Sequence, residues 1–174
     1  MEKHSSVVGL PVICLEDGKR LGTVEGLIFC PGKKEIRALL LERKGCRIKK
    51  DVILYKDVYA LGRDAIIVKS PGCIYKMGTP SVTDELMDKG DILGLRVFTK
   101  SGEDIGVVKD VLFDPVRGNI EGVEISDGLF KDVISGRRIL PLIGRVEFGE
   151  ENILVEKEVV DELLEKDGGL KKFL

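Results

Sequence analysis

Short apolar runs, each broken by a turn signal, follow one another along most of this chain. They predict strands near residues 10–15, 21–30, 35–43, 47–54 and 65–69 of the first half. Between these strands, Asp17-Gly18 suits a tight hairpin that needs a positive φ, and Pro31-Gly32 marks the next reversal of the chain. Short strands at such spacing are typical of a small barrel or sandwich.

The same pattern occurs twice. The segment GLPVICLEDGKRLGTVEGLIFCPGKKEIRALLLE, from Gly9, aligns with GLRVFTKSGEDIGVVKDVLFDPVRGNIEGVEIS, from Gly94, once one single-residue gap is allowed. After a loop of different length, VILYKDVYALGRDAIIV aligns with ILPLIGRVEFGEENILV. The matched pairs include Gly18 with Gly102, Gly22 with Gly106, Phe29 with Phe113, Pro31 with Pro115, Val52 with Ile139, Asp64 with Glu151 and Val68 with Val155. A unit of about 60 residues that repeats only once is typical of tandem domains rather than of a solenoid.

We therefore expect an all-β chain of two tandem small β-barrels, a linker and a C-terminal amphipathic helix. The expected boundaries are 5–70 for the first barrel, 71–90 for the linker, 91–156 for the second barrel and 157–174 for the helix and tail. Aromatic residues make up only 5% of the chain, so we expect each barrel to enclose its own aliphatic interior. Gly22 and Gly106 lie inside strand-like stretches and mark points where a strand bends or lets another backbone approach closely; the alternative is two ordinary loop glycines.

Two short helices complete the expected fold. Residues 81–89 predict one or two helical turns in the linker, with Ser81 or Thr83 as N-cap. In the tail, a one-sided apolar stripe precedes the stop signal Gly168-Gly169. The stripe consists of Val159, Val160, Leu163 and Leu164. We expect this helix to cover an open barrel end or a neighbouring subunit; the alternative is an exposed helix that binds a partner.

The paired pattern Gly-Leu-x-Val, a glycine turn, then (Leu/Ile)-Gly-x-Val-x-x-(Leu/Val)-(Ile/Leu)-Phe-x-Pro resembles the PRC-barrel family. The resemblance covers roughly 5–70 and 90–156; a later (Ile/Leu)-Pro block is present as Ile139-Leu140-Pro141, whereas Val52-Ile53-Leu54 lacks the proline. The family includes the H subunit of the photosynthetic reaction centre and a bacterial ribosome-maturation factor. The resemblance implies a small β-barrel that binds or scaffolds, and it supplies no catalytic motif. A photosynthetic or ribosomal role would rest on shared architecture alone.

The sequence contains no convincing set of catalytic residues. The one histidine, His4, is expected in a frayed N-terminus, and the common phosphate-binding glycine motifs are absent from the sequence. The carboxylates of Asp64, Glu150 and Glu151 fall in turns that the two copies share, which favours a structural role. We expect no enzymatic activity, no cofactor and no metal.

The cysteines point to a reducing compartment. Their spacing fits neither a zinc site nor a redox pair, so we expect reduced, mostly buried thiols at Cys14, Cys30, Cys46 and Cys73. The sequence shows no long apolar run and no secretory signal, so a cytoplasmic location without membrane contact is expected.

Charge is unevenly distributed along the chain. Residues 33–50 contain eight basic and two acidic residues, whereas residues 147–167 contain nine acidic residues against Lys157 and Lys166. A predicted hairpin carries the candidate contacts for an anion or a partner, namely Arg43, Lys44, Arg47, Lys49 and Lys50. These residues could bind RNA or a ribosome, could protect a strand edge from aggregation, or could pair with the acidic tail in a homo-oligomer.

The leading functional hypothesis is a non-enzymatic cytoplasmic scaffold whose two barrels bind a protein partner. One alternative is an RNA- or ribosome-associated factor that uses the basic hairpin. Another is a small-ligand carrier or enzyme with a pocket between the barrels.

Overall fold

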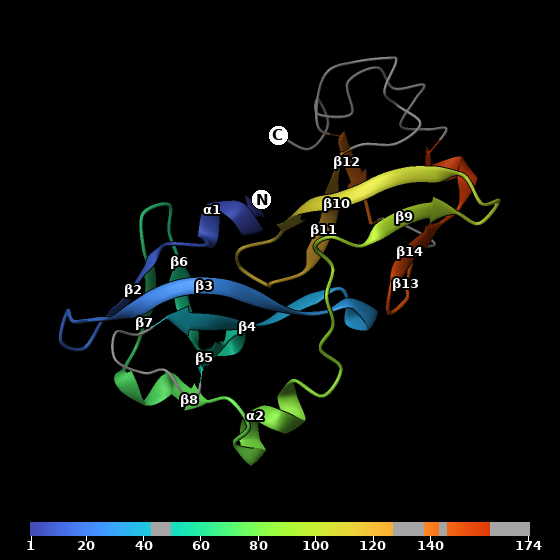
Figure 1. The fold of residues 1–174 in the computed structure, drawn as a ribbon. Coiled ribbons are helices and arrows are strands. Elements are labelled where there is room, and N and C mark those ends of the chain that lie inside the picture. The colour runs from blue at the N-terminus through green and yellow to red at the C-terminus, as the bar shows by residue number, and fades with distance from the viewer. Residues whose placement is uncertain (43–49, 127–137, 143–145, 161–174) are drawn as a thin grey trace.

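The computed structural model describes residues 1–42, 50–126, 138–142 and 146–160, and these residues fold mainly into β-structure (Figure 1). The first sheet has the strand order β6-β7-β2-β3-β4-β5-β8. Its strands are β2 (Pro11–Cys14), β3 (Arg20–Cys30), β4 (Glu35–Glu42), β5 (Asp51–Leu54), β6 (Val58–Leu61), β7 (Ile66–Val68) and β8 (Ile74–Lys76). The strands β6 and β8 were not predicted from the sequence.

The second sheet repeats this arrangement with the order β12-β11-β10-β9-β14-β13. Its strands are β9 (Arg96–Thr99), β10 (Asp104–Phe113), β11 (Ile120–Ser126), β12 (Arg138–Pro141), β13 (Val146–Phe148) and β14 (Asn152–Val155). An additional strand, β1 (Glu2–Lys3), pairs with β10. We call the sheet of β2–β8 the first barrel and the sheet of β9–β14 the second barrel. The expected all-β class with tandem curled sheets is confirmed.

Equivalent hydrogen bonds show that the two sheets are copies of one fold. The amide of Gly9 donates to the carbonyl of Val24 at 2.8 Å, and the amide of Gly94 donates to that of Val108 at 2.9 Å. Each sheet also contains one parallel strand pair at the matched place, β2 with β7 in the first sheet and β9 with β14 in the second. The duplication that the sequence predicts is therefore present in the backbone.

The predicted turn glycines have the expected conformation. Gly18 has φ +68° and Gly102 has φ +92°, in the left-handed region that a residue with a Cβ rarely adopts. Gly22 and Gly106 lie inside β3 and β10, each beside a shift in strand register of the kind that accompanies a bend.

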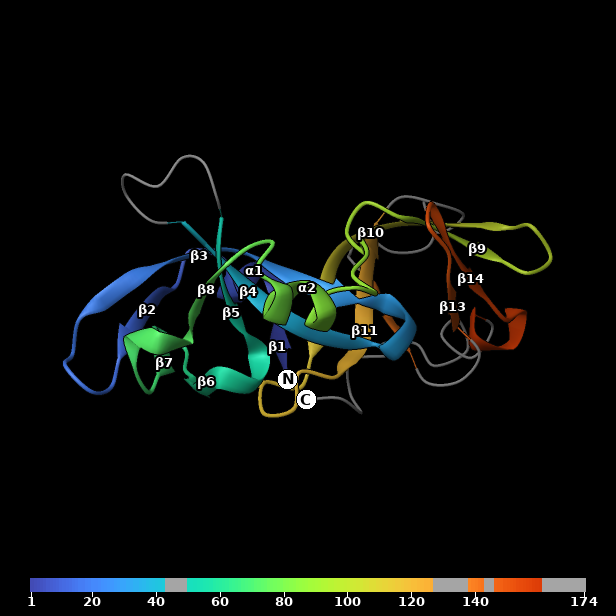
Figure 2. The same ribbon diagram turned by 90° about the horizontal axis from the view of Figure 1, so that it is seen from below.

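The two barrels meet through their β3–β4 and β10–β11 hairpins (Figure 2). The amide of Ile36 donates to the carbonyl of Gly118 at 2.8 Å, and the amide of Ile120 donates to that of Lys34 at 2.7 Å. In the repeat alignment Ile36 matches Ile120, and Lys34 matches Gly118. The contact is thus reciprocal, as in a dimer with approximate two-fold symmetry.

Each barrel also receives a segment that precedes the other barrel. Glu2 and Lys3 pair with Phe113 and Leu112 of β10, and the helix α1 (His4–Val7) follows them. On the other side, the amide of Gly90 donates to the carbonyl of Phe29 at 3.1 Å. The expectation of a frayed N-terminus around His4 is wrong, because strand pairing and packing hold this segment against the second barrel.

The hydrophobic core is continuous across the two barrels. One cluster of buried apolar side chains contains Leu39 and Ile53 of the first barrel together with Phe113 and Leu140 of the second. The expectation of two separate interiors is therefore wrong. Each sheet is a strongly curled half-barrel with an open side, and the other half covers it.

The linker helix α2 (Pro80–Glu85) lies within the predicted region, although its N-cap is Thr79 rather than Ser81 or Thr83. Val82 and Leu86 pack with Ala38, Val52 and Leu54 in a smaller cluster against the first barrel. In the tail, residues 157–160 are helical and Val160 is part of the main core. The remainder of the predicted C-terminal helix lies outside the described residues. The other helices are the single turns η1 (Pro31–Lys33), η2 (Tyr55–Asp57) and η3 (Pro71–Cys73).

Candidate protein-binding surface

Four of the five predicted basic contacts, Arg43, Lys44, Arg47 and Lys49, lie outside the described residues. The fifth, Lys50, is exposed, and its Nζ lies 2.7 Å from Oε1 of Glu25. An exposed ion pair of this kind contributes little to stability. The interpretation of this hairpin as an anion or partner contact stays a prediction.

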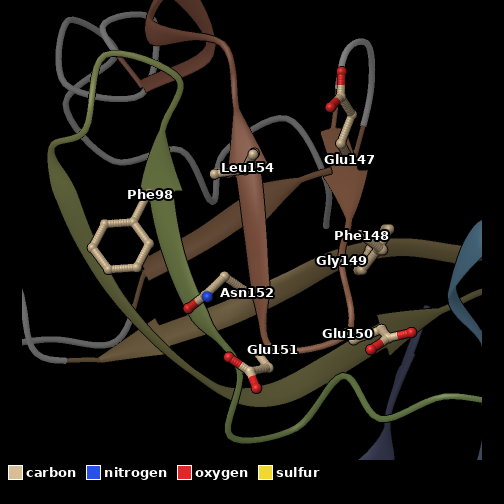
Figure 3. A pocket seen from close by; sticks show the side chains of 8 residues that line it. All are labelled: Phe98, Glu147, Phe148, Gly149, Glu150, Glu151, Asn152 and Leu154. Atoms are coloured by element: carbon tan, nitrogen blue, oxygen red, sulfur yellow. The ribbon is translucent and has the colours of Figure 1, made fainter.

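An open hollow of about 380 Å³ lies on the second barrel, along β9, β14 and β13 (Figure 3). Its floor is apolar and its rim carries carboxylates. The lining residues are Phe98, Glu147, Phe148, Gly149, Glu150, Glu151, Asn152 and Leu154.

Strand alternation places the floor of the hollow on the outer face. Val97 and Val155 face the core, so Phe98 and Leu154 point the other way. Leu154 lies opposite Phe98 in the parallel pair and opposite Glu147 in the antiparallel pair. A row of Glu147, Leu154 and Phe98 therefore crosses the sheet, with the Leu154 side chain 39% exposed.

A tight turn between β13 and β14 forms the acidic end of the hollow. The amide of Gly149 donates to the carbonyl of Asn152 at 2.9 Å, and a Cβ on Gly149 would lie 2.9 Å from that same oxygen. The turn thus requires glycine and presents the next two residues, Glu150 and Glu151, to solvent. Figure 3 shows both carboxylates at this turn, with Glu147 on β13 away from the turn.

The charge of the rim is only partly neutralised. Nζ of Lys100 lies 2.8 Å from a carboxylate oxygen of Glu147 and 2.8 Å from one of Glu156. These hydrogen bonds raise the pKa of Lys100. Glu150 and Glu151 form no ion pair with any residue in the described part of the chain. The hollow therefore combines exposed apolar surface with an excess of negative charge.

The first barrel has the same geometry without this charge. Ile13 and Ile67 lie opposite each other where the second barrel has Phe98 and Leu154. The equivalent turn carries Arg63 and Asp64, whose side chains pair at 3.3 Å. The matching hydrogen bonds from Gly62 to Ala65 and from Gly149 to Asn152 confirm the predicted equivalence of the two turns. The sequence difference between GRDA and GEEN gives an excess of negative charge to the turn of the second barrel and not to that of the first.

Two buried carboxylates that sequence reasoning missed lie under the N-terminal segment. Asp110 and Glu124 face each other across β10 and β11 and are each 2% exposed. Oδ1 of Asp110 accepts a hydrogen bond from the amide of Ser5 at 3.1 Å, and its other oxygen accepts one from the Ser5 hydroxyl. Oε2 of Glu124 lies 2.6 Å from Nζ of Lys3. These carboxylates hold the N-terminal segment in place.

The other candidate chemical groups are also used for packing. The His4 ring lies 5.9 Å from the Phe29 ring, and burial lowers the pKa of His4 although Asp110 opposes the shift. Cys14, Cys30 and Cys73 are buried free thiols, as expected, while Cys46 lies outside the described residues. Among the described residues, no three His, Cys, Asp or Glu side chains gather as a metal site would require. No helix in the described segments is long and apolar enough to cross a membrane.

The family comparison agrees with the repeat. The family model of the PRC-barrel domain matches residues 1–72 and 84–161, one segment for each copy, and this confirms the resemblance found in the sequence. No curated protein matches the chain.

Proposed function

This chain belongs to the PRC-barrel family, and we propose on that basis that it is a non-enzymatic, cytoplasmic scaffold that binds a protein partner. The observation that carries the proposal is the acidic hollow on the outer face of the second barrel. The free, buried thiols of Cys14, Cys30 and Cys73 are compatible with a reducing compartment.

The hollow fits an extended segment in which Lys or Arg residues flank Leu, Ile or Phe. Phe98 and Leu154 would bury one or two apolar side chains, each worth about 1.5–3 kcal/mol when fully buried. Ion pairs to Glu150 and Glu151 would add about 0.2–1 kcal/mol each, because both carboxylates are exposed. We expect a weak affinity, on the order of 10–1000 µM, with charge acting mainly on selectivity and association rate.

The roles of the buried polar groups support binding rather than catalysis. Asp110 and Glu124 hold the N-terminal segment, and the His4 ring packs on Phe29. Tyr55 and Phe113 contact each other edge to face at 6.4 Å between the barrels. A pocket between the barrels, as a ligand carrier or enzyme would use, is therefore the weaker alternative.

A peptide titration tests the proposed partner chemistry. The probe is a labelled nine-residue peptide in which Lys and Arg flank Leu and Phe, compared with a peptide in which Glu replaces the basic residues. Fluorescence anisotropy should show binding of the basic peptide only, weakening as salt rises. Loss of two exposed ion pairs alone would lower the affinity by about twofold to thirtyfold. The double variant Glu150→Lys/Glu151→Lys should lower it further, because the new lysines also repel the basic peptide.

The first barrel provides the matched control. Asp64→Lys leaves two basic residues in the matched turn, as the double variant does in the second barrel, and should leave peptide binding unchanged, whereas Leu154→Ser should weaken it. Equal binding of the basic and acidic peptides, or equal loss in Asp64→Lys and the double variant, would contradict the proposal.

Affinity capture at low salt extends the test to natural partners. The full chain with a C-terminal tag is compared with Glu150→Lys/Glu151→Lys, with and without nuclease, by mass spectrometry. Proteins that bind the full chain but not the variant support the proposal. Nuclease-sensitive material captured equally by both would instead support the RNA- or ribosome-associated alternative through residues 43–50.

A further inference from the structure

The contact between the two barrels has the form of a dimer interface within one chain. The β3–β4 hairpin contacts the β10–β11 hairpin through the reciprocal backbone hydrogen bonds of Ile36 with Gly118 and of Ile120 with Lys34. The N-terminal segment closes the edge of β10, and Gly90 bonds to β3 in return. Side chains at matched positions nevertheless differ, and the differences are complementary.

The first complementary pair is Tyr55 with Gly118. The Tyr55 ring lies so close to Gly118 that a Cβ there would be 2.8 Å from both Cδ1 and Cε1 of the ring. The Tyr55 hydroxyl also donates to the carbonyl of Pro115 at 2.8 Å. The first barrel has Lys34 where the second has Gly118, with a left-handed backbone at both positions. In a pair of two first barrels, Tyr55 would therefore meet the Cβ of Lys34.

The second complementary set consists of the N-terminal segment and the buried carboxylates. Lys3 and Ser5 contact Glu124 and Asp110 of the second barrel. The first barrel has Leu40 and Gly26 at these two matched positions, which offer no carboxylate. In a pair of two first barrels, the Lys3 ammonium would face an apolar side chain.

Two second barrels would also be poorly matched. Gly90 lies opposite Phe29 as Glu2 lies opposite Phe113, so Asp91 comes next in the place of Lys3. The segment before β9, which the structure describes at residues 91–95, has no helix to match α1, which carries Ser5. The carboxylates of Glu124 and Asp110 would then lose the ammonium and the hydroxyl that contact them. A buried carboxylate that loses such a partner is strongly disfavoured.

We propose that the inner faces of the two barrels form a selective interface: each binds a barrel of the other type and rejects one of its own. The partner that fits the inner face of the first barrel is the second barrel, in the same chain or in another copy. Tyr55, Gly118, Lys3 and Glu124 are the specificity determinants. The linker is not required for the contact once the chain has folded.

Cleavage of the folded chain tests this proposal. A protease recognition sequence is inserted after Met87, whose side chain is 73% exposed, and the purified full chain is cut there. Size-exclusion chromatography at micromolar concentration should show one complex of the two halves. After unfolding in urea and refolding, native mass spectrometry should detect the mixed pair in at least tenfold excess over either like pair.

Two variants locate the determinants. Lys3→Met should weaken the mixed pair at least tenfold, whereas Lys157→Met, which removes an ammonium 3.2 Å from Glu103 at the surface of the second barrel, should not. Tyr55→Leu should raise the share of first-barrel pairs, because Leu142 already stands at the matched position. Separation of the halves of the cleaved unmodified chain, or a statistical mixture of mixed and like pairs, would overturn the proposal whether or not the variants fold.

Discussion

Replacement of Gly118 by alanine should destabilise the chain through two separate effects. The backbone at Gly118 has φ +76°, where a Cβ costs about 1–2 kcal/mol. The new methyl group would also lie 2.8 Å from two atoms of the Tyr55 ring, and overpacking of this kind costs about 1–3 kcal/mol. We expect the free energy of unfolding to fall by roughly 2–5 kcal/mol, a large part of what a domain has available.

Gly102 separates the two effects. It has φ +92° in a hairpin turn, but a Cβ there would meet no atom within 4 Å. Gly102→Ala should therefore cost only the backbone strain of about 1–2 kcal/mol. Urea denaturation of both variants, monitored by far-UV circular dichroism because the chain has no tryptophan, measures the difference in the free energy of unfolding.

A double-mutant cycle assigns the remaining cost to the Tyr55 ring. In the background Tyr55→Leu, Gly118→Ala should cost about 1–3 kcal/mol less than in the unmodified chain, because the ring atoms are gone. The cost of Gly118→Ala could instead equal that of Gly102→Ala, or be the same in both backgrounds. Either result would refute the close fit between the barrels.

Two further predictions concern the N-terminal segment. Lys3→Met should lower the free energy of unfolding by about 1.5–3 kcal/mol in urea denaturation, and adding Glu124→Leu should recover part of the loss; no recovery would argue against the contact. Burial lowers the pKa of His4 below its ordinary 6.5. Between the lowered pKa and 6.5 the unfolded chain therefore binds more protons than the folded chain, so the free energy of unfolding should fall as the pH drops through this range. His4→Gln should flatten this dependence, since the chain has one histidine; an unchanged pH profile would exclude His4 as its source.

The repeated strands and turns could be predicted because their signals are local. Glycine at Gly18 and Gly102, with alternation on either side, requires no knowledge of distant contacts. The second copy also supplied an independent test of each assignment. The shared turn at Asp64 and Glu151 was recognised in this way.

The N-terminal segment could not be predicted, because its partners are distant in sequence. Lys3 contacts Glu124 and Ser5 contacts Asp110, more than a hundred residues away. A short polar segment such as EKHSS carries no periodicity, and the burial of Asp110 and Glu124 has no local signal. Alternation likewise shows which face of a sheet is apolar, but not whether the sheet closes on itself or on a second sheet.

Only part of the acidic hollow could be predicted from the sequence. The carboxylates of Glu150 and Glu151 could be placed in a turn, and alternation alone directs Phe98 and Leu154 away from the core. Their proximity depends on the parallel pairing of β9 with β14. Strand partners so far apart in the chain cannot be read from spacing.

Fusion of two barrels in one chain has a consequence for binding stoichiometry. In a symmetric homodimer both outer faces would be identical, so a partner would bind twice. Here the hollow with Glu150 and Glu151 is acidic, whereas the matched turn pairs Arg63 with Asp64. A basic segment should therefore bind once per chain, and isothermal titration with the basic peptide should give a stoichiometry near one. A stoichiometry of two would mean that the shared strand geometry, rather than the acidic rim of the second barrel, determines recognition.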